Sequence, residues 1–288
     1  MTSPQGRAIG RVGVVGAGQV GTMLGLALRR APGRAGVEEV ALFDRDRSAA
    51  RASLARGAGD RVVRALEEAF DADVVILALP VPAIVSTLES HGARLGRGQL
   101  LLDTGSAKGA VVDAMRAHVP GRAHVLGGHP LVGTAVAGAE GARPELLDGA
   151  MFVLTPVRDD AEALTRGRAL VGAIGSRAVE MDATTHDRVM ARTSHLAHVA
   201  AFALAAVGRR RGAAEELVSS GYLGATRLAG SDPRMVAGFL SANASDVRAA
   251  ISELVEELVE MRSLLAGDAD DLAAQLEIRR NRPSASDG

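Results

Sequence analysis

The hydrophobic pattern of the first part of the chain alternates between two kinds of segment. Short runs rich in valine, leucine and isoleucine have the length and composition of buried strands. These runs cover residues 11–16, 40–44, 74–79, 100–104, 125–127, 151–155 and 177–181. Helical periodicity separates them at 18–30, 48–56, 110–117 and 161–174. The alternation predicts an α/β fold, a Rossmann-type doubly wound parallel sheet.

The pattern becomes purely helical from Thr184 onward. Residues 184–210 predict one long helix, and 213–220, 235–265 and 268–279 predict others, while Asp232-Pro233 has the form of a helix start. We therefore expect two domains, a sheet domain over residues 8–182 and an all-helical domain over 183–280. The polar ends, residues 1–8 and 281–288, are expected to be a loose and a disordered tail.

Composition narrows the possible classes of protein. The net charge of -1 gives no electrostatic reason to expect nucleic acid or a membrane surface as a partner, and the absence of cysteine excludes disulfides and thiolate catalysis. No secretory signal pattern or membrane-length apolar run occurs, so a cytoplasmic protein is expected. Lys108 is the single lysine among 33 basic residues. Lysine occurs here either by chance or because this position requires a compact ammonium group.

A glycine-rich motif follows the first predicted strand and opens the first helix. It reads Gly16-Ala17-Gly18-Gln19-Val20-Gly21. Its glycines allow a tight turn and a close approach of pyrophosphate to the helix N-terminus. Asp44 ends the second strand, where a carboxylate binds the adenosine ribose and repels a 2′-phosphate, which favours NAD. Arg45 follows it and leaves NADP open, because an arginine there can bind phosphate.

Four histidines lie in two short contexts, and histidine is the side chain best suited to proton transfer near neutral pH. His129 follows a strand in Gly127-Gly128-His129-Pro130, and the others are His186, His195 and His198. Helical spacing places Asp187, His195 and His198 on one stripe, which we expect to face a cleft between the domains. His186 falls on another face, so these histidines are not expected to bind a metal.

Five ordered motifs together resemble the prephenate/arogenate dehydrogenase family of tyrosine biosynthesis. They are Asp103 to Lys108, with its Gly-Ser-x-Lys form; the His-Pro loop 127–138; His186-Asp187 with the segment 194–198; the segment 221–229; and Asp232-Pro233. The resemblance covers nearly the whole chain. It implies NAD-dependent oxidative decarboxylation of a cyclohexadienyl substrate, with prephenate giving 4-hydroxyphenylpyruvate, and a homodimer formed through the helical domain.

The resemblance also implies roles for particular residues. His129 would be the catalytic partner of the substrate hydroxyl, assisted by Ser106, and Arg227 would bind a substrate carboxylate. Further substrate contacts are expected from Ser194, His195, His198, Thr134, Gly221 and Asp187. Cofactor contacts are expected from Gly16, Gly18, Gln19, Val20, Gly21, Asp44, Arg45, Leu79, Pro80, Asp103 and Ser106.

The chain departs from the family pattern at the side-chain end of the substrate. Ala135 and Gly224 stand where the family often has acids, Ala197 where it has proline, and Val236 where it has tryptophan. Prephenate, arogenate and 4-amino-4-deoxyprephenate therefore remain open as substrates, in primary or secondary metabolism. No regulatory domain is expected after residue 280.

Two other readings are compatible with a Rossmann domain joined to helices. A β-hydroxyacid dehydrogenase would use a lysine from the helical domain, whereas Lys108 precedes that domain. A non-catalytic NAD-binding protein is the alternative from another class, because the missing acids are compatible with a loss of activity.

Overall fold

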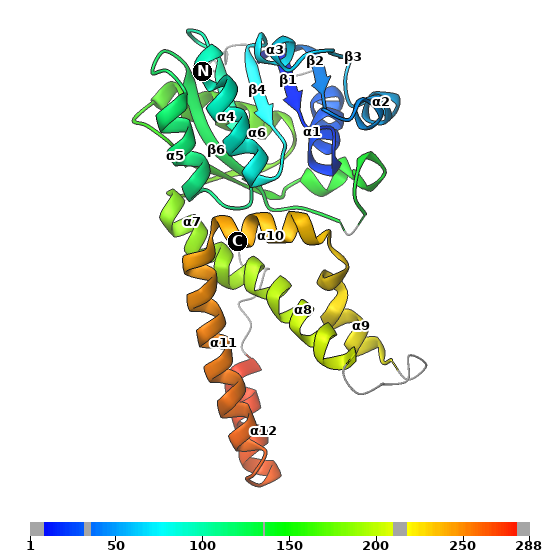
Figure 1. The fold of residues 1–288 in the computed structure, drawn as a ribbon, viewed down its shortest axis with the longest axis vertical. Helices are drawn as coiled ribbons and strands as arrows, with labels where there is room; N and C mark the ends of the chain where they lie inside the picture. Colours follow the sequence, from blue (N-terminus) through cyan, green and yellow to red (C-terminus); the bar gives the residue numbers. More distant parts are fainter. Residues whose placement is uncertain (1–8, 32–35, 135, 210–217, 281–288) are drawn as a thin grey trace, which may run out of the picture.

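The computed structural model describes residues 9–31, 36–134, 136–209 and 218–280. An α/β region and a helical region lie one above the other, and α7 (Ala183–Met190) connects them (Figure 1). The two predicted tails, and most of the helix predicted at 213–220, fall outside the described residues.

The sheet has the strand order expected of a Rossmann domain, with added strands at one edge. Its order in the described residues is β3-β2-β1-β4-β5-β6-β7-β8. The strands are β1 (Gly10–Val15), β2 (Val37–Phe43), β3 (Arg61–Val62), β4 (Val74–Leu77), β5 (Leu100–Asp103), β6 (His124–Pro130), β7 (Met151–Pro156) and β8 (Arg177–Glu180). The chain crosses from one side of the sheet to the other between β1 and β4, where such sheets bind nucleotides.

The predicted doubly wound parallel sheet is confirmed, and one pair at this added edge departs from parallel pairing. The pairs from β3 to β6 are parallel, but β7 pairs antiparallel with β6, and β8 is parallel to β7. A parallel return requires a crossover, usually a helix. Here the connection holds only the short 3-10 turns Ala139–Gly141 and Pro144–Leu147, so the chain folds back antiparallel.

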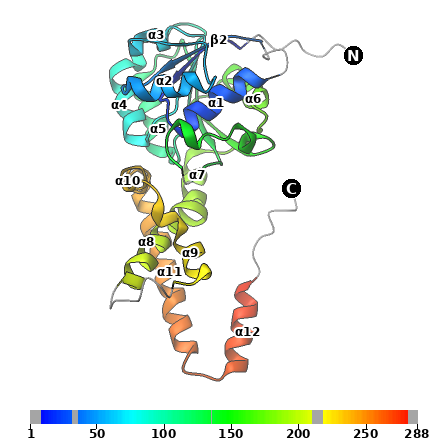
Figure 2. The same cartoon turned by 90° about the vertical axis from the view of Figure 1, so that its right-hand side faces the viewer.

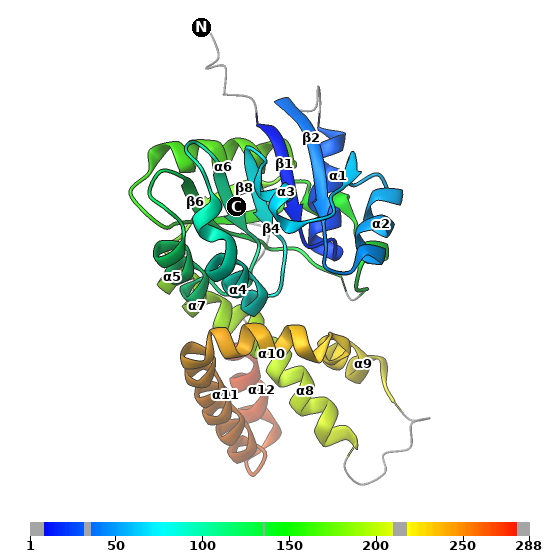
Figure 3. The same ribbon diagram turned by 45° about the horizontal axis from the view of Figure 1, so that its top comes forward.

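Helices cover both faces of the sheet (Figure 3). They are α1 (Gln19–Arg30), α2 (Arg47–Ala55), α3 (Leu66–Phe70), α4 (Val81–His91), α5 (Gly109–His118) and α6 (Ala161–Ala173). One core cluster joins the sheet to α1 and α6, and a second joins it to α3, α4 and α5. The sequence reading missed α3 and α4. Helix α4 begins directly after β4 at Pro80-Val81-Pro82, since proline is tolerated in a first helical turn, where amides lack partners.

The helical region is built from one bent helix and four others. Helix α7 continues through a π-helical turn, Ala191–His195, into α8 (Leu196–Arg209). After it come α9 (Ser220–Thr226), α10 (Pro233–Ala242), α11 (Ala244–Leu264) and α12 (Ala269–Arg280). The single helix predicted over 235–265 is two helices, because the chain turns at Asn243, whose φ is -120° and ψ 33°. Helices α11 and α12 form a hairpin that points away from the sheet (Figure 2).

The boundary between the two regions lies near Asp182. Strand β8 ends at Glu180, and the Asp182 side chain caps α7 by accepting a hydrogen bond from the Thr185 amide. We propose the domain division at this point, with a nucleotide domain to residue 182 and a helical domain from residue 183. None of the helices in the described residues is long and apolar enough to cross a membrane.

Candidate active site

The glycine motif forms a turn that only glycine fits and leaves one face open. Gly16 has a φ of +101°, and a Cβ there would lie 2.2 Å from the Ala78 carbonyl oxygen. A Cβ at Gly21 would lie 1.9 Å from the Gly16 carbonyl oxygen, whereas one at Gly18 would meet no described atom within 4 Å. The open side at Gly18 adjoins the N-terminus of α1, whose amides can bind phosphate.

Asp44 lies directly after β2 and holds the glycine turn in place. Its Oδ2 accepts a hydrogen bond from the Ala17 amide at 2.8 Å, and its Oδ1 accepts one from the Asp46 amide at 2.9 Å. A carboxylate offers about four acceptor positions, so ribose hydroxyls can still bind. Arg45 next to it is exposed, and Leu79 and Pro80 follow β4 across the switch point.

Gln19 and Thr134 bind each other. The Gln19 amide nitrogen donates to the Thr134 hydroxyl, and the Thr134 amide donates to Gln19 Oε1 at 3.2 Å. These contacts fasten the loop after β6 to the first turn of α1, so both side chains are engaged within the protein. Ala135, where the family often has an acid, lies outside the described residues.

Lys108 and Asp103 form a fully buried ion pair between β5 and β6. The Lys108 ammonium also donates to the Gly128 carbonyl at 2.7 Å, and the Asp103 carboxylate accepts from the amides of Gly105 and Gly128 at 2.6 and 2.9 Å. Burial lowers the pKa of Lys108, and the neighbouring Asp103 carboxylate opposes that shift. The side-chain oxygens of Asp103 are therefore buried and occupied within the protein, and its contact with the cofactor stays a prediction. The reading of Lys108 as a position for a compact ammonium agrees with this geometry.

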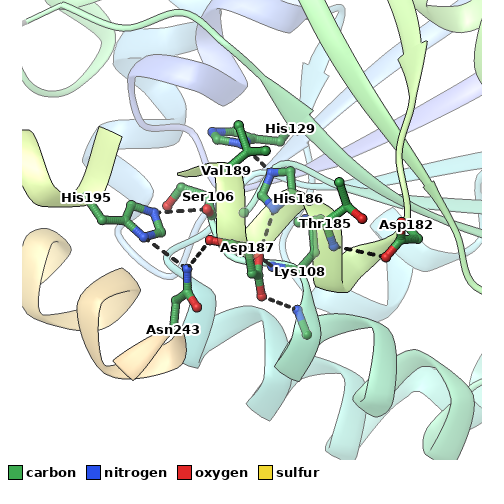
Figure 4. A network of polar contacts seen from close by, with 12 residues as sticks. Ser106, Lys108, His129, Asp182, Thr185, His186, Asp187, Val189, His195 and Asn243 are labelled. Carbon is green, nitrogen blue, oxygen red and sulfur yellow. Dashed lines mark hydrogen bonds and ion pairs between the residues drawn. The ribbon is translucent and has the colours of Figure 1, made fainter. Parts of the chain in front are cut away.

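His129 lies within β6 rather than in the loop after it, because the strand continues to Pro130. Its Nδ1 is 2.9 Å from His186 Nε2, and His186 Nδ1 is 2.7 Å from Asp187 Oδ1 (Figure 4). Burial holds the pKa of His129 well below its ordinary value of 6.5, and the nearby His186, Lys108 and His195 lower it further. His129 is therefore a neutral imidazole at neutral pH, and it is partly exposed.

His186 is the residue that sequence reasoning missed. Its ring is fully buried between His129 and Asp187, although helical spacing had set it apart from the site. The contact joins residues 57 positions apart, so no local pattern could reveal it. The neighbouring pair His186-Asp187 was the available signal, since a carboxylate beside a histidine is a common way to orient the ring.

Asp187 points toward α5. Its Oδ1 and Oδ2 accept hydrogen bonds from the amides of Lys108 and Gly109 at 2.7 and 2.8 Å, at the start of α5. Burial raises the pKa of this carboxyl, but the hydrogen bonds from His186 and the two amides outweigh it, so the pKa is lowered overall. Both Asp187 oxygens are thus bonded within the protein, and a contact between Asp187 and substrate stays a prediction.

His195 joins the two domains. It is fully buried, with Nε2 donating to the Ser106 carbonyl at 3.2 Å and Nδ1 3.3 Å from the Asn243 side-chain nitrogen. Its ring stacks on Phe239 at a centroid distance of 4.7 Å. Burial lowers its pKa from 6.5 to about 4. Both nitrogens of His195 have partners within the protein, and its contact with substrate stays a prediction.

Asp187 and His195 of the predicted stripe both contact the segment after β5, through Lys108 and Ser106, and His198 follows the π-helical turn Ala191–His195. A π-helical turn adds a residue to one turn and so changes the angular position of every later side chain. His198 is half-buried, donates from Nδ1 to the Ser194 carbonyl at 3.2 Å and meets Phe239 edge-on, which leaves its Nε2 as an acceptor. Ser194 and Ser106 are also half-buried near this junction.

Arg227 and Gly221 lie farther along the helical region. Arg227 opens the 3-10 turn Arg227–Gly230 and is exposed, and Gly221 is exposed in α9. No hydrogen bond or ion pair joins Arg227 to the histidines within the described residues. The same residues contain no group of three or more histidine, aspartate or glutamate side chains arranged to hold a metal.

A nucleotide-binding glycine turn beside a neutral, partly exposed histidine on the same sheet is the arrangement of a dinucleotide-dependent dehydrogenase. Comparison with known families makes this specific. Residues 24–180 match the family described as prephenate dehydrogenase, nucleotide-binding domain. Residues 182–278 match the one described as prephenate dehydrogenase, dimerization domain. The chain belongs to the prephenate dehydrogenase family and is an oxidoreductase of that kind.

Individual relatives agree with this assignment. The chain is 33% identical over 260 residues to the probable prephenate dehydrogenase NovF of Streptomyces niveus, covering 89% of this chain and 69% of the relative. It is 28% identical to the cyclohexadienyl dehydrogenase of Zymomonas mobilis, covering 81% of each. Among solved structures, prephenate dehydrogenase from Aquifex aeolicus in complex with hydroxyphenyl propionate and NAD+ superposes with a TM-score of 0.84 at 25% identity, covering 94% of this chain and 96% of that one.

Proposed function

We propose that this protein catalyses the NAD-dependent oxidative decarboxylation of prephenate to 4-hydroxyphenylpyruvate, and that it works as a homodimer. The observation that carries the proposal is the neutral imidazole of His129, partly exposed near the end of β6 on the edge that also holds the glycine turn. The names of the relatives from Streptomyces niveus and Aquifex aeolicus support prephenate as the substrate. The exposed apolar side chains of α11 and the description of the second family match support the dimer.

The residues at the switch point fit NAD. Gly16 and Gly21 form the turn, Gly18 leaves room for pyrophosphate, and Asp44 keeps acceptor positions for ribose hydroxyls. A carboxylate at this position repels a 2′-phosphate, which favours NAD over NADP, while the exposed Arg45 makes NADP the competing cofactor to test. The bound nicotinamide would supply the hydride acceptor.

The chain's own residues account for the remaining chemistry. His129 accepts the proton of the substrate hydroxyl at carbon 4 as the hydride leaves that carbon, and the ring carboxylate departs as carbon dioxide. The electrons of the broken carbon–carboxylate bond complete an aromatic ring, and the phenolate oxygen then takes the proton back. Arg227 binds a substrate carboxylate, and Ser106, at the end of β5, helps to place the hydroxyl.

A second candidate substrate has one observation in its favour. Arogenate dehydrogenase from Synechocystis superposes with a TM-score of 0.74 at 26% identity, covering 93% of this chain and 96% of that one. Arogenate and 4-amino-4-deoxyprephenate each carry an amino group that prephenate lacks. At Gly224, where the family often has an acid, this chain offers no charge to an ammonium group. This favours prephenate over arogenate, whose amino group is on the side chain, and leaves 4-amino-4-deoxyprephenate, whose amino group is on ring carbon 4, to the test below.

The test is the absorbance of reduced nicotinamide with purified protein, prephenate, arogenate and 4-amino-4-deoxyprephenate, each with NAD and NADP. We expect the highest kcat/KM with prephenate and NAD. His129→Asn should retain NAD binding and lose most turnover. NAD binding without turnover of any of the three substrates would reject the proposal and favour a non-catalytic NAD-binding protein. The 3-hydroxyisobutyrate dehydrogenase of Salmonella typhimurium, at 17% identity and a TM-score of 0.58, shares the fold alone.

A further inference from the structure

We propose that His186 and Asp187 are positioning residues that form a hydrogen-bonded relay with His129. In this relay they fix the tautomer of His129, and they take up the proton that His129 removes from the substrate for the duration of turnover. The proposal rests on the proposed function for its proton-uptake step. The tautomer assignment rests on the geometry alone.

The hydrogen-bonding chemistry allows one neutral arrangement of the three groups. The ionised Asp187 carboxylate can only accept, so His186 Nδ1, 2.7 Å away, must carry the proton. In neutral His186 the other nitrogen, Nε2, is then an acceptor. His129 Nδ1, 2.9 Å from that nitrogen, must therefore be the donor. This leaves the lone pair of His129 on Nε2, the nitrogen outside the relay, as the acceptor available to a substrate hydroxyl.

The inner end of the relay is held rigidly. The Asp187 carboxylate accepts hydrogen bonds from the amides of Lys108 and Gly109, so it cannot turn away from His186. The backbone carbonyl of Asp187 also accepts from the Asn243 side chain at 2.7 Å. His186 is fully buried, so water does not compete for its nitrogens. Because both nitrogens of His186 are hydrogen-bonded, the His186 ring is fixed and orients the ring of His129.

The surrounding charges favour the inner position for an extra proton. The charged and titratable groups that act on His129 are His186, Lys108 and His195, and each opposes a positive charge on its ring. His186 instead faces the Asp187 carboxylate. The geometry thus gives a positive charge on the His186 ring a carboxylate partner, which the groups that act on His129 do not offer.

The proton balance closes over one turnover. The substrate hydroxyl proton moves to His129 Nε2, and the His129 Nδ1 proton moves to His186 Nε2. His129 is then neutral in its other tautomer, and His186 carries both protons against Asp187. When the ring carboxylate has left as carbon dioxide, the phenolate oxygen takes the proton from His129 Nε2, and His186 returns its proton to His129 Nδ1. The relay gains and loses no proton overall.

Two substitutions separate positioning from proton uptake. In His186→Gln the side-chain oxygen reaches the place of Nε2, so it can accept from His129 Nδ1 but cannot take up its proton. In His186→Asn the side chain is shorter, so it neither accepts the hydrogen bond from His129 Nδ1 nor takes up the proton. We expect kcat to fall about 100-fold or more in the second, within the range for general acid–base catalysis, and less, about 10-fold, in the first, where the positioning is kept. KM for prephenate and NAD should change less than about threefold, because His186 is buried behind His129 and touches neither molecule.

The matched control is His124→Asn. His124 lies on the same strand as His129 and pairs with a carboxylate in a similar way, its Nδ1 being 2.8 Å from Asp160 Oδ2, but it lies at the opposite end of β6. We expect its kcat to stay within about twofold of the unsubstituted enzyme. Equal losses in kcat for His124→Asn and His186→Asn would mean that His186 has only a structural role, and the relay would be rejected.

A measurement that does not depend on turnover tests the tautomer. NMR of the NAD-bound protein labelled with nitrogen-15 in histidine should show neutral His129 protonated on Nδ1, with its signals identified through His129→Asn. In His186→Asn the Nε2-protonated tautomer should appear. Observation of that tautomer in the unsubstituted protein would overturn the relay even if His186→Asn misfolds. If the tautomer is as expected but no cyclohexadienyl substrate turns over, the proposed function fails and the geometric assignment stands.

Discussion

The α/β region and the helical region differ in how completely they bury their apolar side chains. Two clusters of buried side chains fill both faces of the sheet, with residues such as Ile76 and Leu88 at 1% and 0% exposure. The buried cluster of the helical region contains only Ala191, Val247 and Ala250. The sheet region thus completes its own core, whereas the helical region has little core of its own.

The apolar side chains left in contact with solvent show the same contrast. Most of the large exposed ones lie on the helical region, including Leu204, Val207, Leu223, Val255, Leu258, Val259, Leu265, Leu276 and Ile278. Exposed apolar patches of this kind mark surfaces that another molecule covers. The comparison teaches that the sheet region is stabilised from within, whereas the helical region leaves apolar side chains exposed, which the proposed homodimer would cover.

The largest expected effect tests the interior of the sheet region. Lys108→Met leaves the buried Asp103 carboxylate without its cation, and removing one partner of a buried pair costs about 3–5 kcal/mol. Denaturation by urea should show this loss in the free energy of unfolding. Adding Asp103→Asn should recover most of it, since an amide carries no buried charge. A loss below about 1 kcal/mol in the single variant would show that the pair does not stabilise this region.

The next effect tests the surface of the helical region. Leu258 is 59% exposed on α11, and Leu258→Glu would place a charge in both halves of the proposed two-fold interface. Each buried leucine contributes about 2 kcal/mol, so the dimer dissociation constant should rise at least about 100-fold, as measured by sedimentation equilibrium. Leu146→Glu, at 42% exposure on the sheet region, is the matched control and should leave association unchanged. Equal effects of the two substitutions would contradict the contrast between the regions.

The same contrast explains what could be predicted from sequence. Apolar runs located seven strands, because fully buried strands have a distinct composition, but missed β3, which has two residues. The antiparallel turn into β7 was missed because the pattern does not tell which way a strand runs. In the site, the glycine turn and His129 carry local signals. His186 does not, because its role arises from a contact with His129, which lies 57 positions away in the chain and across the domain boundary.

A third, smaller effect tests the junction of the two regions through its pH dependence. His195 has a pKa of about 4 in the folded protein, against about 6.5 in the unfolded chain. Between pH 4 and pH 6.5 the unfolded chain binds more protons at this histidine than the folded protein does. The contribution of His195 to the stability of the folded protein is therefore complete above pH 6.5 and is lost as the pH falls toward 4. The loss is roughly 3 kcal/mol at most. His195→Gln removes this titration, so the variant's melting temperature should fall less over that interval. Parallel curves for the two proteins would show that His195 is not held neutral at the junction.

The smallest effect asks whether the two regions unfold as one unit. Asp232 caps α10 in the helical region, and Asp160 caps α6 in the sheet region, each by accepting a backbone amide. Replacing such a cap with alanine costs about 1 kcal/mol, or about 2–4 °C in melting temperature. Because Asp187 and His195 bind the sheet region directly, we expect one calorimetric transition that both Asp232→Ala and Asp160→Ala lower. Two transitions, each lowered by one substitution alone, would show that these contacts do not couple the regions and that the helical region melts with its dimer interface.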